Sequence, residues 1–405
     1  MTKVVISHPA QQHSYALARA MEYGQIDYKY VTTVYAKKNN MTKMFSMILS
    51  GDAKRRAKSR RDDGISDDNV IQFCEFSSLL LLFLQRVDKR KVIYNHVKTH
   101  INKRYARKLS RYLKKNNIDK VVTFDQYSHY LIKELNSINY SLDIILDMSA
   151  PSYRYMVDSF NKNINGYSLG KDEIKCLSIS DYEIKLANKY LVASEVSLKS
   201  VVYSNSSTNI NNIFLCKYGV ENLRSQIRKT SDTLNVCFIG RLNRKKGFDL
   251  FNRLAKKFID YSSLNFCALG SRSTLEIGND ELSKNIDLLG HVPKEDVVAI
   301  LDECDLLIMP SLADGYGLVV TEALSRGVVV LCSDHVGASS YIVNRYNGYI
   351  FESGNFSSLE YYFNKLISFS VEEIDEMKNN ALLSVKDESW ISYYKSVLRA
   401  IYSET

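Results

Sequence analysis

Short apolar runs rich in β-branched residues alternate with helical stretches through most of the chain, and no other feature constrains its fold as strongly. Such alternation is typical of parallel sheets whose faces are covered by helices. It occurs as two successive series, and the first contains a long, mostly helical segment at residues 36–115. The sequence therefore predicts an α/β protein with two Rossmann-like, doubly wound domains.

The predicted elements follow from this pattern. In the first series we expect strands at residues 3–7, 28–34, 120–124, 143–147 and 190–193. In the second series we expect strands at residues 234–240, 265–270, 286–289, 306–309, 328–332 and 348–351. Helices of the second series are expected at residues 247–258, 294–302, 318–325 and 356–369.

The two series also define the domain organisation. A chain of 405 residues accommodates two or three domains. Residues 217–232 are polar and lack both the helical and the strand period, so we expect a linker there. We predict an N-terminal domain over residues 1–216 and a C-terminal domain over residues 233–385. A final helix, near residues 386–405, is expected to pack back on the first domain.

Composition and hydropathy exclude several classes of protein. Apolar residues make up 45% and charged residues 24%, as in ordinary soluble proteins, so a disordered or fibrous chain is excluded. The longest apolar run, residues 79–84, is far shorter than the roughly 18 residues that span a bilayer. Because Ser-His-Pro follows the apolar residues 4–6 at once, we expect no signal peptide and a cytoplasmic protein. The seven cysteines form no C-x-x-C pair, which predicts reduced, buried thiols.

The positive charge is concentrated in the first part of the chain. Residues 1–120 contain 25 Lys and Arg against 10 Asp and Glu, a net +15, which leaves −6 of the total +9 for residues 121–405. Residues 86–115 alone hold 12 basic residues and one acid. A second basic cluster consists of Lys54, Arg55, Arg56, Lys58, Arg60 and Arg61. Such a surface attracts phosphates of nucleic acid, of anionic lipid or of a polyprenyl diphosphate, unless it is simply a solvated surface.

A first candidate site lies where the strand at residues 234–240 runs into a turn and then a helix. Gly240 and Gly247 allow a tight turn, while Arg241 and Lys246 place two cations beside a helix N-terminus, where an anion is already favoured. In an open α/β sheet, ligands bind at this edge. The segment therefore predicts a phosphate site, although basic residues in such a loop can also be plain surface.

A second candidate site follows the strand at residues 306–309. Asp314 lies in a Gly-rich loop, and Glu322 lies eight positions later on the predicted helix. Backbone N–H groups around Gly317 would point at an anion, and the two carboxylates can accept hydrogen bonds from sugar hydroxyls. This arrangement suits a nucleotide diphosphate sugar. Alternatively, Glu322 only complements the helix dipole and Asp314 only forms a turn.

Together, the two segments resemble the nucleotide-sugar domain of glycosyltransferase family 4, the group 1 type of retaining enzymes with the GT-B fold. The Gly-Arg, spacer, Lys-Gly pattern of that family is matched by Gly240-Arg241 and Lys246-Gly247. Its Glu-Gly-Phe-Gly, four residues, Glu pattern is matched by residues 314–317 and Glu322, with Asp314 in place of the first Glu. The resemblance runs over residues 234–352 and, more weakly, over residues 183–194. It implies two domains that face each other across a cleft, with the acceptor on the first.

The resemblance assigns roles on the donor side. Arg241, Lys246 and Asp314 would be the catalytic set, with the two cations holding the donor diphosphate and neutralising the leaving group without a metal or another cofactor. Glu322 would bind the ribose hydroxyls. The shorter side chain of Asp314 withdraws its carboxylate by roughly 1.5 Å relative to Glu. The remaining expected donor-binding residues are Gly240, His291, Val292, Gly315, Tyr316, Gly317, Leu318 and Val319.

The acceptor side is expected at the strand ends of the first domain. The loop after the first strand contains His8 and His13, which could hydrogen-bond a sugar, although such histidines are often packed or capping. Asp125 and Asp147 each end a predicted strand and should face the same edge. Many family members carry a histidine near one of these positions, and His129 is the nearest substitute. In a retaining front-face mechanism the donor phosphate can take the acceptor proton, so no protein base is strictly needed.

The resemblance implies a hexosyltransferase that moves a sugar from a nucleotide diphosphate sugar to a lipid-linked or saccharide acceptor in bacterial capsule, O-antigen or similar surface polysaccharide synthesis. The positive charge of the first half is consistent with an acceptor that lies at the inner face of the cell membrane. There, helices rich in Lys and Arg, with residues 79–84 and Tyr94, Tyr105 and Tyr112, could lie on an anionic leaflet.

Three alternatives stay open at this point. The basic stripe with interleaved tyrosines is also compatible with a nucleic-acid-binding protein, but no nucleic-acid module is present and the second half is acidic. Asp314 is the one hint of an inactive GT-B scaffold. A GT-B sugar phosphorylase or nucleotide-sugar epimerase would share the fold. The set of Arg241, Lys246 and Glu322 fits nucleotide-sugar transfer better, with no nucleic acid as partner.

Overall fold

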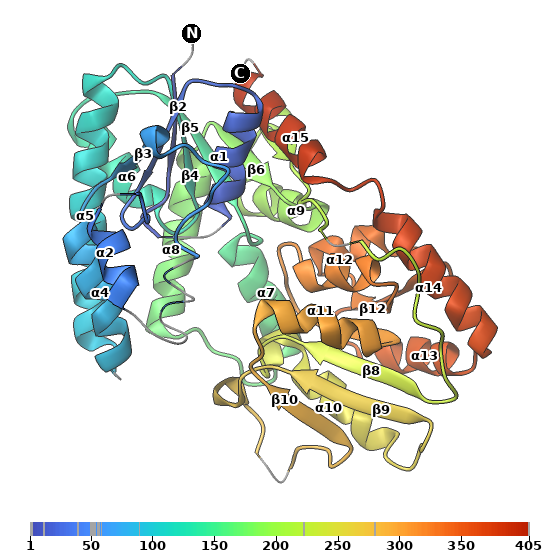
Figure 1. Cartoon of the computed structure of the whole chain (residues 1–405). Helices are drawn as coiled ribbons and strands as arrows, with labels where there is room; N and C mark the ends of the chain where they lie inside the picture. The colour runs from blue at the N-terminus through green and yellow to red at the C-terminus, as the bar shows by residue number, and fades with distance from the viewer. Residues whose placement is uncertain are drawn as a thin grey trace.

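The computed structural model of the chain describes residues 3–10, 13–38, 40–48, 54, 57, 59–88, 90–221, 223–278 and 281–403. Over these residues the chain forms two sheets, each covered by helices, that lie side by side as two domains (Figure 1). All strand pairs named for the two sheets are parallel. The predicted α/β class with two doubly wound domains is therefore confirmed.

The first sheet has seven strands in the order β3-β2-β1-β4-β5-β6-β7. Its strands are β1 (Val4–Ser7), β2 (Tyr28–Thr32), β3 (Val70–Gln72), β4 (Lys120–Phe124), β5 (Asp143–Met148), β6 (Lys189–Val192) and β7 (Ile213–Leu215). The five predicted strands of this half match β1, β2, β4, β5 and β6 closely. The sequence pattern misses β3 and β7, because strands of three residues are too short to display a period.

Helices cover both faces of the first sheet. They are α1 (Ser14–Tyr23), α2 (Met41–Ile48), α4 (Glu75–Val87), α5 (Val92–Lys115), α6 (Ser128–Ser137), α7 (Tyr153–Asn163), α8 (Lys171–Leu186) and α9 (Glu195–Ser204). The prediction of a mostly helical segment at residues 36–115 is correct for α2, α4 and α5, and it is wrong where β3 interrupts them.

The second sheet has six strands in the order β10-β9-β8-β11-β12-β13. Its strands are β8 (Leu234–Ile239), β9 (Leu264–Leu269), β10 (Ile286–Gly290), β11 (Leu306–Met309), β12 (Val329–Ser333) and β13 (Gly348–Phe351). The helices around it are α10 (Phe248–Lys257), α11 (Lys294–Glu303), α12 (Leu318–Ser325), α13 (Phe356–Ile367) and α14 (Val371–Val385). All six predicted strands and four predicted helices are present, and α14 is an addition.

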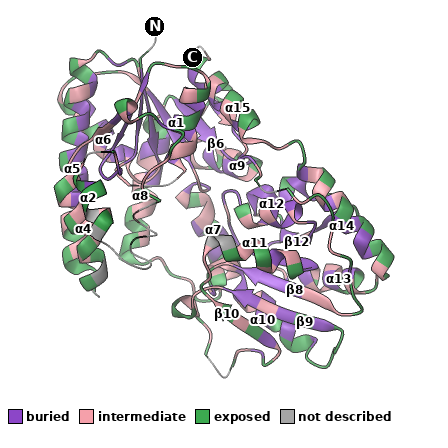
Figure 2. Cartoon of the chain, viewed as in Figure 1, coloured by how far each residue is buried: buried purple, intermediate pink, exposed green. Residues whose placement is uncertain are grey.

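The last helix, α15 (Trp390–Tyr402), returns from the second domain and packs against α1 of the first (Figure 1). The segment between the sheets lies against other parts of the chain. For example, the Val220 N–H donates to the Glu388 carbonyl, and the Arg224 N–H donates to the Ser325 carbonyl. One cluster of buried apolar residues continues from the first sheet through Tyr218 into the second. Figure 2 shows this buried interior in both domains. The two sheet edges that carry the candidate residues are thus held near each other.

Several composition-based predictions can be compared with the fold. All seven cysteines are free, but only Cys216, Cys237, Cys304 and Cys332 are buried, so the prediction of burial is wrong for the other three. No helix among the described residues is long and apolar enough to cross a membrane. Arg55, Arg56, Lys58 and Lys89 of the two basic clusters lie outside the described residues.

Candidate functional site

The loop after β8 is shaped by its own sequence. A single 3-10 turn, Arg244–Lys246, begins where the Asn243 side chain accepts a hydrogen bond from the Lys246 N–H at 3.0 Å. Gly247 ends the turn with φ +72°, and a Cβ at this position would lie 2.0 Å from the Pro310 carbonyl oxygen. Because only glycine tolerates both conditions, the turn presses against the end of β11. The first predicted loop therefore borders the second.

The loop after β11 brings Asp314 to Lys246. Asp314 is held by its backbone, since its N–H donates to the His335 carbonyl and its carbonyl accepts from the Gly337 N–H, both at 3.0 Å. Its Oδ2 lies 2.5 Å from the Lys246 Nζ. Gly317, with φ +80°, then starts α12. Two of the three residues predicted as catalytic thus form an ion pair at the edge of the second sheet.

Other donor-side candidates lie at the ends of the neighbouring strands. A Cβ added to Gly270, after β9, would lie 2.2 Å from the Gly240 carbonyl oxygen, so the ends of β8 and β9 are in close contact. The Gly270 N–H donates to the Gly290 carbonyl at 2.9 Å, which brings in the end of β10. His291, which is exposed, and Val292, which is half-buried, follow directly. The candidates for the base and for the diphosphate therefore share one edge.

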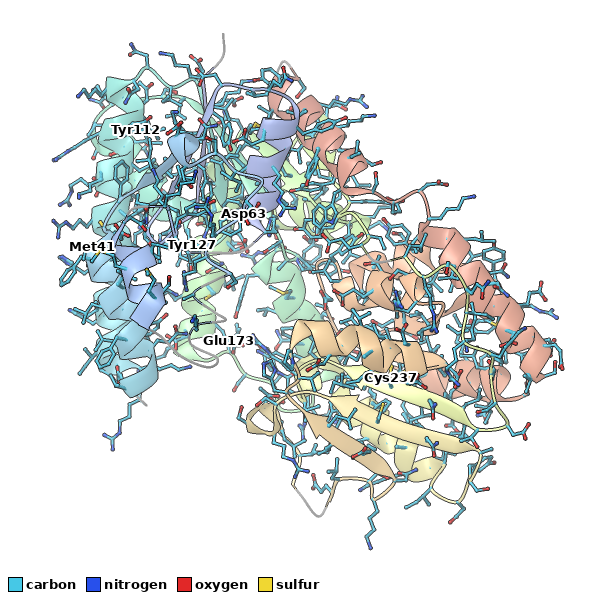
Figure 3. The ribbon with its side chains drawn as sticks, in the orientation of Figure 1. Met41, Asp63, Tyr112, Tyr127, Glu173 and Cys237 are labelled. Atoms are coloured by element: carbon cyan, nitrogen blue, oxygen red, sulfur yellow. The ribbon has the colours of Figure 1, made fainter. Side chains whose placement is uncertain are left out.

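The cations of the first loop differ in their partners. Arg241 is exposed, and none of the ion pairs found among the described residues involves it. Lys245 forms an ion pair of 2.5 Å with Glu173 from the start of α8, beside Tyr167. Burial raises the pKa of Glu173, but hydrogen bonds, first that of Lys245, lower it overall. Figure 3 places Glu173 on the side of the first domain that faces the second. Lys245 therefore links the domains, whereas Lys246 is paired with Asp314 within the second domain and Arg241 is exposed.

The side chains at the start of α12 differ in their exposure. Leu318 is exposed, whereas Val319 and Glu322 are half-buried. The side chain of Tyr316 is buried, and its hydroxyl donates to the Tyr218 carbonyl at 3.0 Å. Tyr316 is therefore available to a donor only through its backbone.

Gly315 is the point at which this loop touches the first domain. A Cβ here would lie 2.3 Å from the Ser149 carbonyl oxygen, just beyond β5. Its own carbonyl accepts hydrogen bonds from the Ser194 and Ser197 hydroxyls at 2.5 and 3.2 Å. A residue without a side chain is thus required for the loop to approach the first domain this closely.

On the first domain, His13 and Asp147 form a pair across the end of the sheet. The His13 Nε2 lies 2.6 Å from the Asp147 Oδ1, and both side chains are largely buried. Burial lowers the pKa of His13, but the charge and hydrogen bond of Asp147, with a contribution from Asp125, raise it overall. The imidazole is therefore held in one orientation, with its charged form favoured.

Asp125 lies next to this pair. Its backbone N–H donates to the Asp147 carbonyl at 3.2 Å, while its buried Oδ1 has no hydrogen-bond partner among the described residues. Burial, followed by the charges of Glu183 and Asp147, raises the pKa of Asp125 to about 7. Asp125 can therefore hold or release a proton near neutral pH.

His129 and His8 are placed differently from His13. The His129 ring is buried, and its Nδ1 lies 3.2 Å from the Glu183 Oε1. Glu183 also accepts from the N–H groups of Gln126 and His129, at 2.7 and 2.8 Å, and so caps the start of α6. The buried His8 ring accepts from the Ala10 N–H at 2.9 Å. These two histidines hold loops in place, and for His8 this is the structural alternative that the sequence left open.

The two sides meet at the domain junction. The Tyr218 ring packs against His13 on one side, at 5.3 Å between centroids, and against Tyr316 on the other, at 5.0 Å. Asp147 lies in β5, two residues before Ser149, the first residue that Gly315 contacts. The His13–Asp147 pair and the Asp314–Gly317 loop therefore lie at the same junction.

Sequence reasoning missed four residues that build this region: Glu173, Glu183, Tyr218 and Lys245. Glu183 meets His129 over a separation of 54 residues, and Glu173 meets Lys245 over 72. No local pattern marks such partners. Tyr218 lies in the expected linker, where an aromatic residue in a polar stretch was the one available signal.

Comparisons with known proteins agree with this geometry. Residues 219–383, which contain both donor-side loops, match the family model described as "Glycosyl transferases group 1". The amylovoran biosynthesis glycosyltransferase AmsK of Erwinia amylovora is 25% identical over 138 residues, covering 31% of this chain and 34% of AmsK. The putative teichuronic acid biosynthesis glycosyltransferase TuaC of Bacillus subtilis (strain 168) is 31% identical over 121 residues, covering 30% of each. The chain thus spans about a third of the length of these relatives.

Among solved structures, Anabaena Alr3699/HepE in complex with UDP-glucose matches with a TM-score of 0.65 at 11% identity, covering 100% of both chains. The chain has the GT-B fold. At this identity the likeness to HepE establishes the fold alone. The family match and the named relatives support an enzyme of the glycosyltransferase class.

Proposed function

We propose that the chain is a retaining glycosyltransferase of family 4. In this proposal it transfers a sugar from a nucleotide diphosphate sugar to a lipid-linked or saccharide acceptor in bacterial surface polysaccharide synthesis. The observation that carries the proposal is the convergence of Lys246, Arg241, Asp314 and the start of α12 at one edge of the second sheet.

The donor side explains how the leaving group is stabilised. When the bond between the anomeric carbon and the diphosphate oxygen breaks, negative charge grows on the diphosphate. Lys246 and Arg241 neutralise this charge, and the α12 N-terminus adds its partial positive charge. The Lys246 ammonium is already oriented by Asp314 at 2.5 Å. Glu322 accepts the ribose hydroxyls, and His291 and Val292 lie against the base.

The residues on the acceptor side orient the acceptor sugar. The acceptor hydroxyl forms the new bond to the anomeric carbon on the face that the diphosphate leaves, and its proton passes to a diphosphate oxygen. His13, fixed by Asp147, and Asp125 hydrogen-bond the acceptor sugar beside that point. Because the positive charge comes from Arg241 and Lys246, we propose that the reaction needs no metal ion.

The relatives support the substrate classes of this proposal. AmsK and TuaC are named for the biosynthesis of amylovoran and of teichuronic acid, both of which are polysaccharides, and HepE was solved with UDP-glucose. We therefore propose a surface polysaccharide as product and place UDP-sugars first among the donors. We also place the enzyme in the cytoplasm, at the inner face of the cell membrane.

Thermal unfolding of the purified chain with UDP-, GDP-, ADP- and dTDP-sugars tests the donor class, because a ligand of the native state raises the melting temperature. We expect one base to give a selective rise that is lost in Lys246→Ala. The matched control is Lys256→Ala, which removes an exposed lysine from α10 of the same domain and should keep the rise. No rise with any donor, or an equal rise in Lys246→Ala, would contradict the proposal.

A further inference from the structure

Helix α4 carries an apolar stripe that no part of the described chain covers. Phe76, Leu80, Phe83 and Val87 follow the spacing i, i+4, i+7, i+11, which places them on one helical face. Their exposed fractions are 65%, 47%, 59% and 54%. An apolar stripe of this kind normally faces a core, so its exposure among the described residues is typical of a surface that binds a partner.

The stripe continues onto the elements beside α4. In α2, which packs against α4, Met44 and Met47 are 67% and 71% exposed. At the start of α5, directly after α4, Val92 and Ile93 are 69% and 60% exposed. We call these residues of α2, α4 and the start of α5 the apolar face. Figure 1 shows the three helices together at one edge of the first domain.

Helix α5 adds a basic surface to the apolar face. It has 24 residues and no Asp or Glu, and its exposed basic side chains line a shallow depression together with His100. Those side chains are Lys103, Arg104, Arg107, Lys108 and Arg111. A single acidic contact is seen there among the described residues, between Arg107 and Glu134 at 3.6 Å. The surface beside the apolar face therefore attracts an anionic partner.

The basic side chains lie on the exposed side of α5. The opposite side of α5 packs into the first domain through Tyr105, Leu109 and Leu113. Tyr105 is buried, so the expectation that it would lie on a membrane is wrong. Tyr94 and Tyr112 are half-buried. The partner is thus contacted by the apolar face and by the cations of α5 rather than by the tyrosines.

We propose that the apolar face and the basic side of α5 form a docking surface for an anionic lipid bilayer. The apolar side chains enter the interface between headgroups and acyl chains, and the Lys and Arg side chains contact the lipid phosphates. A nucleic acid would use the cations but not the apolar stripe. The proposal rests on the proposed function, since it would hold the enzyme at the surface where a lipid-linked acceptor lies.

Flotation of the full chain with vesicles tests the surface directly. Vesicles of phosphatidylcholine alone are compared with vesicles of equal parts phosphatidylcholine and phosphatidylglycerol. We expect at least about tenfold stronger binding to the anionic vesicles, weakened by salt. Equal or absent binding to the two kinds of vesicle overturns the proposal, and so does tighter binding of a single-stranded oligonucleotide than of anionic vesicles.

Two variants separate the two contributions to docking. Phe76→Ser with Phe83→Ser should reduce binding to anionic vesicles about tenfold or more, as should Arg104→Glu with Lys108→Glu. The matched controls are Leu383→Ser on α14, where Leu383 is 52% exposed, and Lys256→Glu on α10. Both controls should bind as the unmodified chain does. Unchanged binding in either double variant, with melting temperatures confirming the fold, overturns the proposal.

The donor assay distinguishes this proposal from the proposed function. A chain that binds donor but not vesicles contradicts the docking surface alone. A chain that binds vesicles but shows no donor-induced rise in melting temperature contradicts the transferase assignment alone. Because the substituted residues are remote in sequence from both donor-side loops, the double variants should keep the donor response.

Discussion

The carboxyl edges of the two sheets have similar topology but carry side chains of opposite charge. The edge of the second sheet presents two cations, Arg241 and Lys246, on the loop after β8, which leads into α10 at Gly247. The edge of the first sheet presents two carboxyl groups, Asp125 and Asp147, and the His13 imidazole, whose pKa is raised mainly by Asp147 against the effect of burial. Under the proposed function, the first of these edges binds an anionic donor and the second binds the hydroxyl groups of the acceptor.

The two edges also differ in how they are assembled. The cations and Glu322 belong to two short sequence segments, each a strand, a turn and a helix. The pair of His13 and Asp147, by contrast, joins residues 134 positions apart. Under the proposed function, donor recognition is therefore encoded locally, whereas acceptor orientation depends on the order of strands in the first sheet. The following predictions test this contrast.

The largest effect is expected at the cationic edge. Lys246→Ala removes a charge that, under the proposed function, neutralises the leaving group, and we expect kcat to fall roughly a hundredfold to a thousandfold. The measurement is steady-state turnover with the donor identified by thermal unfolding. Lys256→Ala serves as the control, and turnover near that of the unmodified enzyme would place Lys246 outside the site.

A smaller effect is expected at Glu322, where the proposed function places the ribose of the donor. Glu322→Gln replaces a charged acceptor by a neutral one, so the affinity for the nucleoside diphosphate should fall roughly tenfold to a hundredfold. Isothermal titration with the free diphosphate measures this loss. The ribose role is refuted if the affinity is unchanged.

At the first sheet we expect a change in pH dependence. Asp147→Asn removes the charge that opposes the effect of burial, so the pKa of His13 should fall. In a plot of kcat/KM against pH, the fall in rate that follows deprotonation of His13 should therefore move to lower pH. In the pH range of the former plateau, kcat/KM should fall roughly tenfold. A profile of unchanged shape, with only uniformly lower rates, would show that Asp147 supports the fold alone.

Asp125 links the same edge to stability. Its folded pKa of about 7 lies above its ordinary value of 3.8, so between these values the folded state binds more protons than the unfolded state. The free energy of unfolding should therefore decrease as pH rises toward about 7 and level off above it. Asp125→Asn should remove this decrease and be more stable than the unmodified chain by roughly 1 to 3 kcal/mol above pH 7. Urea unfolding on both sides of pH 7 tests this, and parallel curves for the two proteins would refute it.

The smallest effect is expected from chelation. If Arg241 and Lys246 supply the positive charge at the donor edge, EDTA should leave turnover within about twofold of its starting value. Turnover before and after dialysis against EDTA is the measurement. If turnover is lost completely and a divalent metal restores it, Arg241 and Lys246 do not suffice to neutralise the leaving group.

The sequence by itself determined the two α/β series and the donor-side loops. The bounds of α12 and the turns at Gly240, Gly247 and Gly317 were predictable. A strand, its turn and the following helix are specified by neighbouring residues. The short strands β3 and β7 were not, because three residues show no period and acquire their extended form from the strands beside them.

Only the tertiary structure decided which distant residues meet. The contacts of His13 with Asp147 and of Lys245 with Glu173 require the strand order and the docking of two domains, which no local pattern contains. The structure also decided that residues 79–84, the most apolar run of the chain, contain no buried residue. Hydropathy records that a segment tends to leave water, whereas the fold determines whether the chain itself provides the surface that covers it.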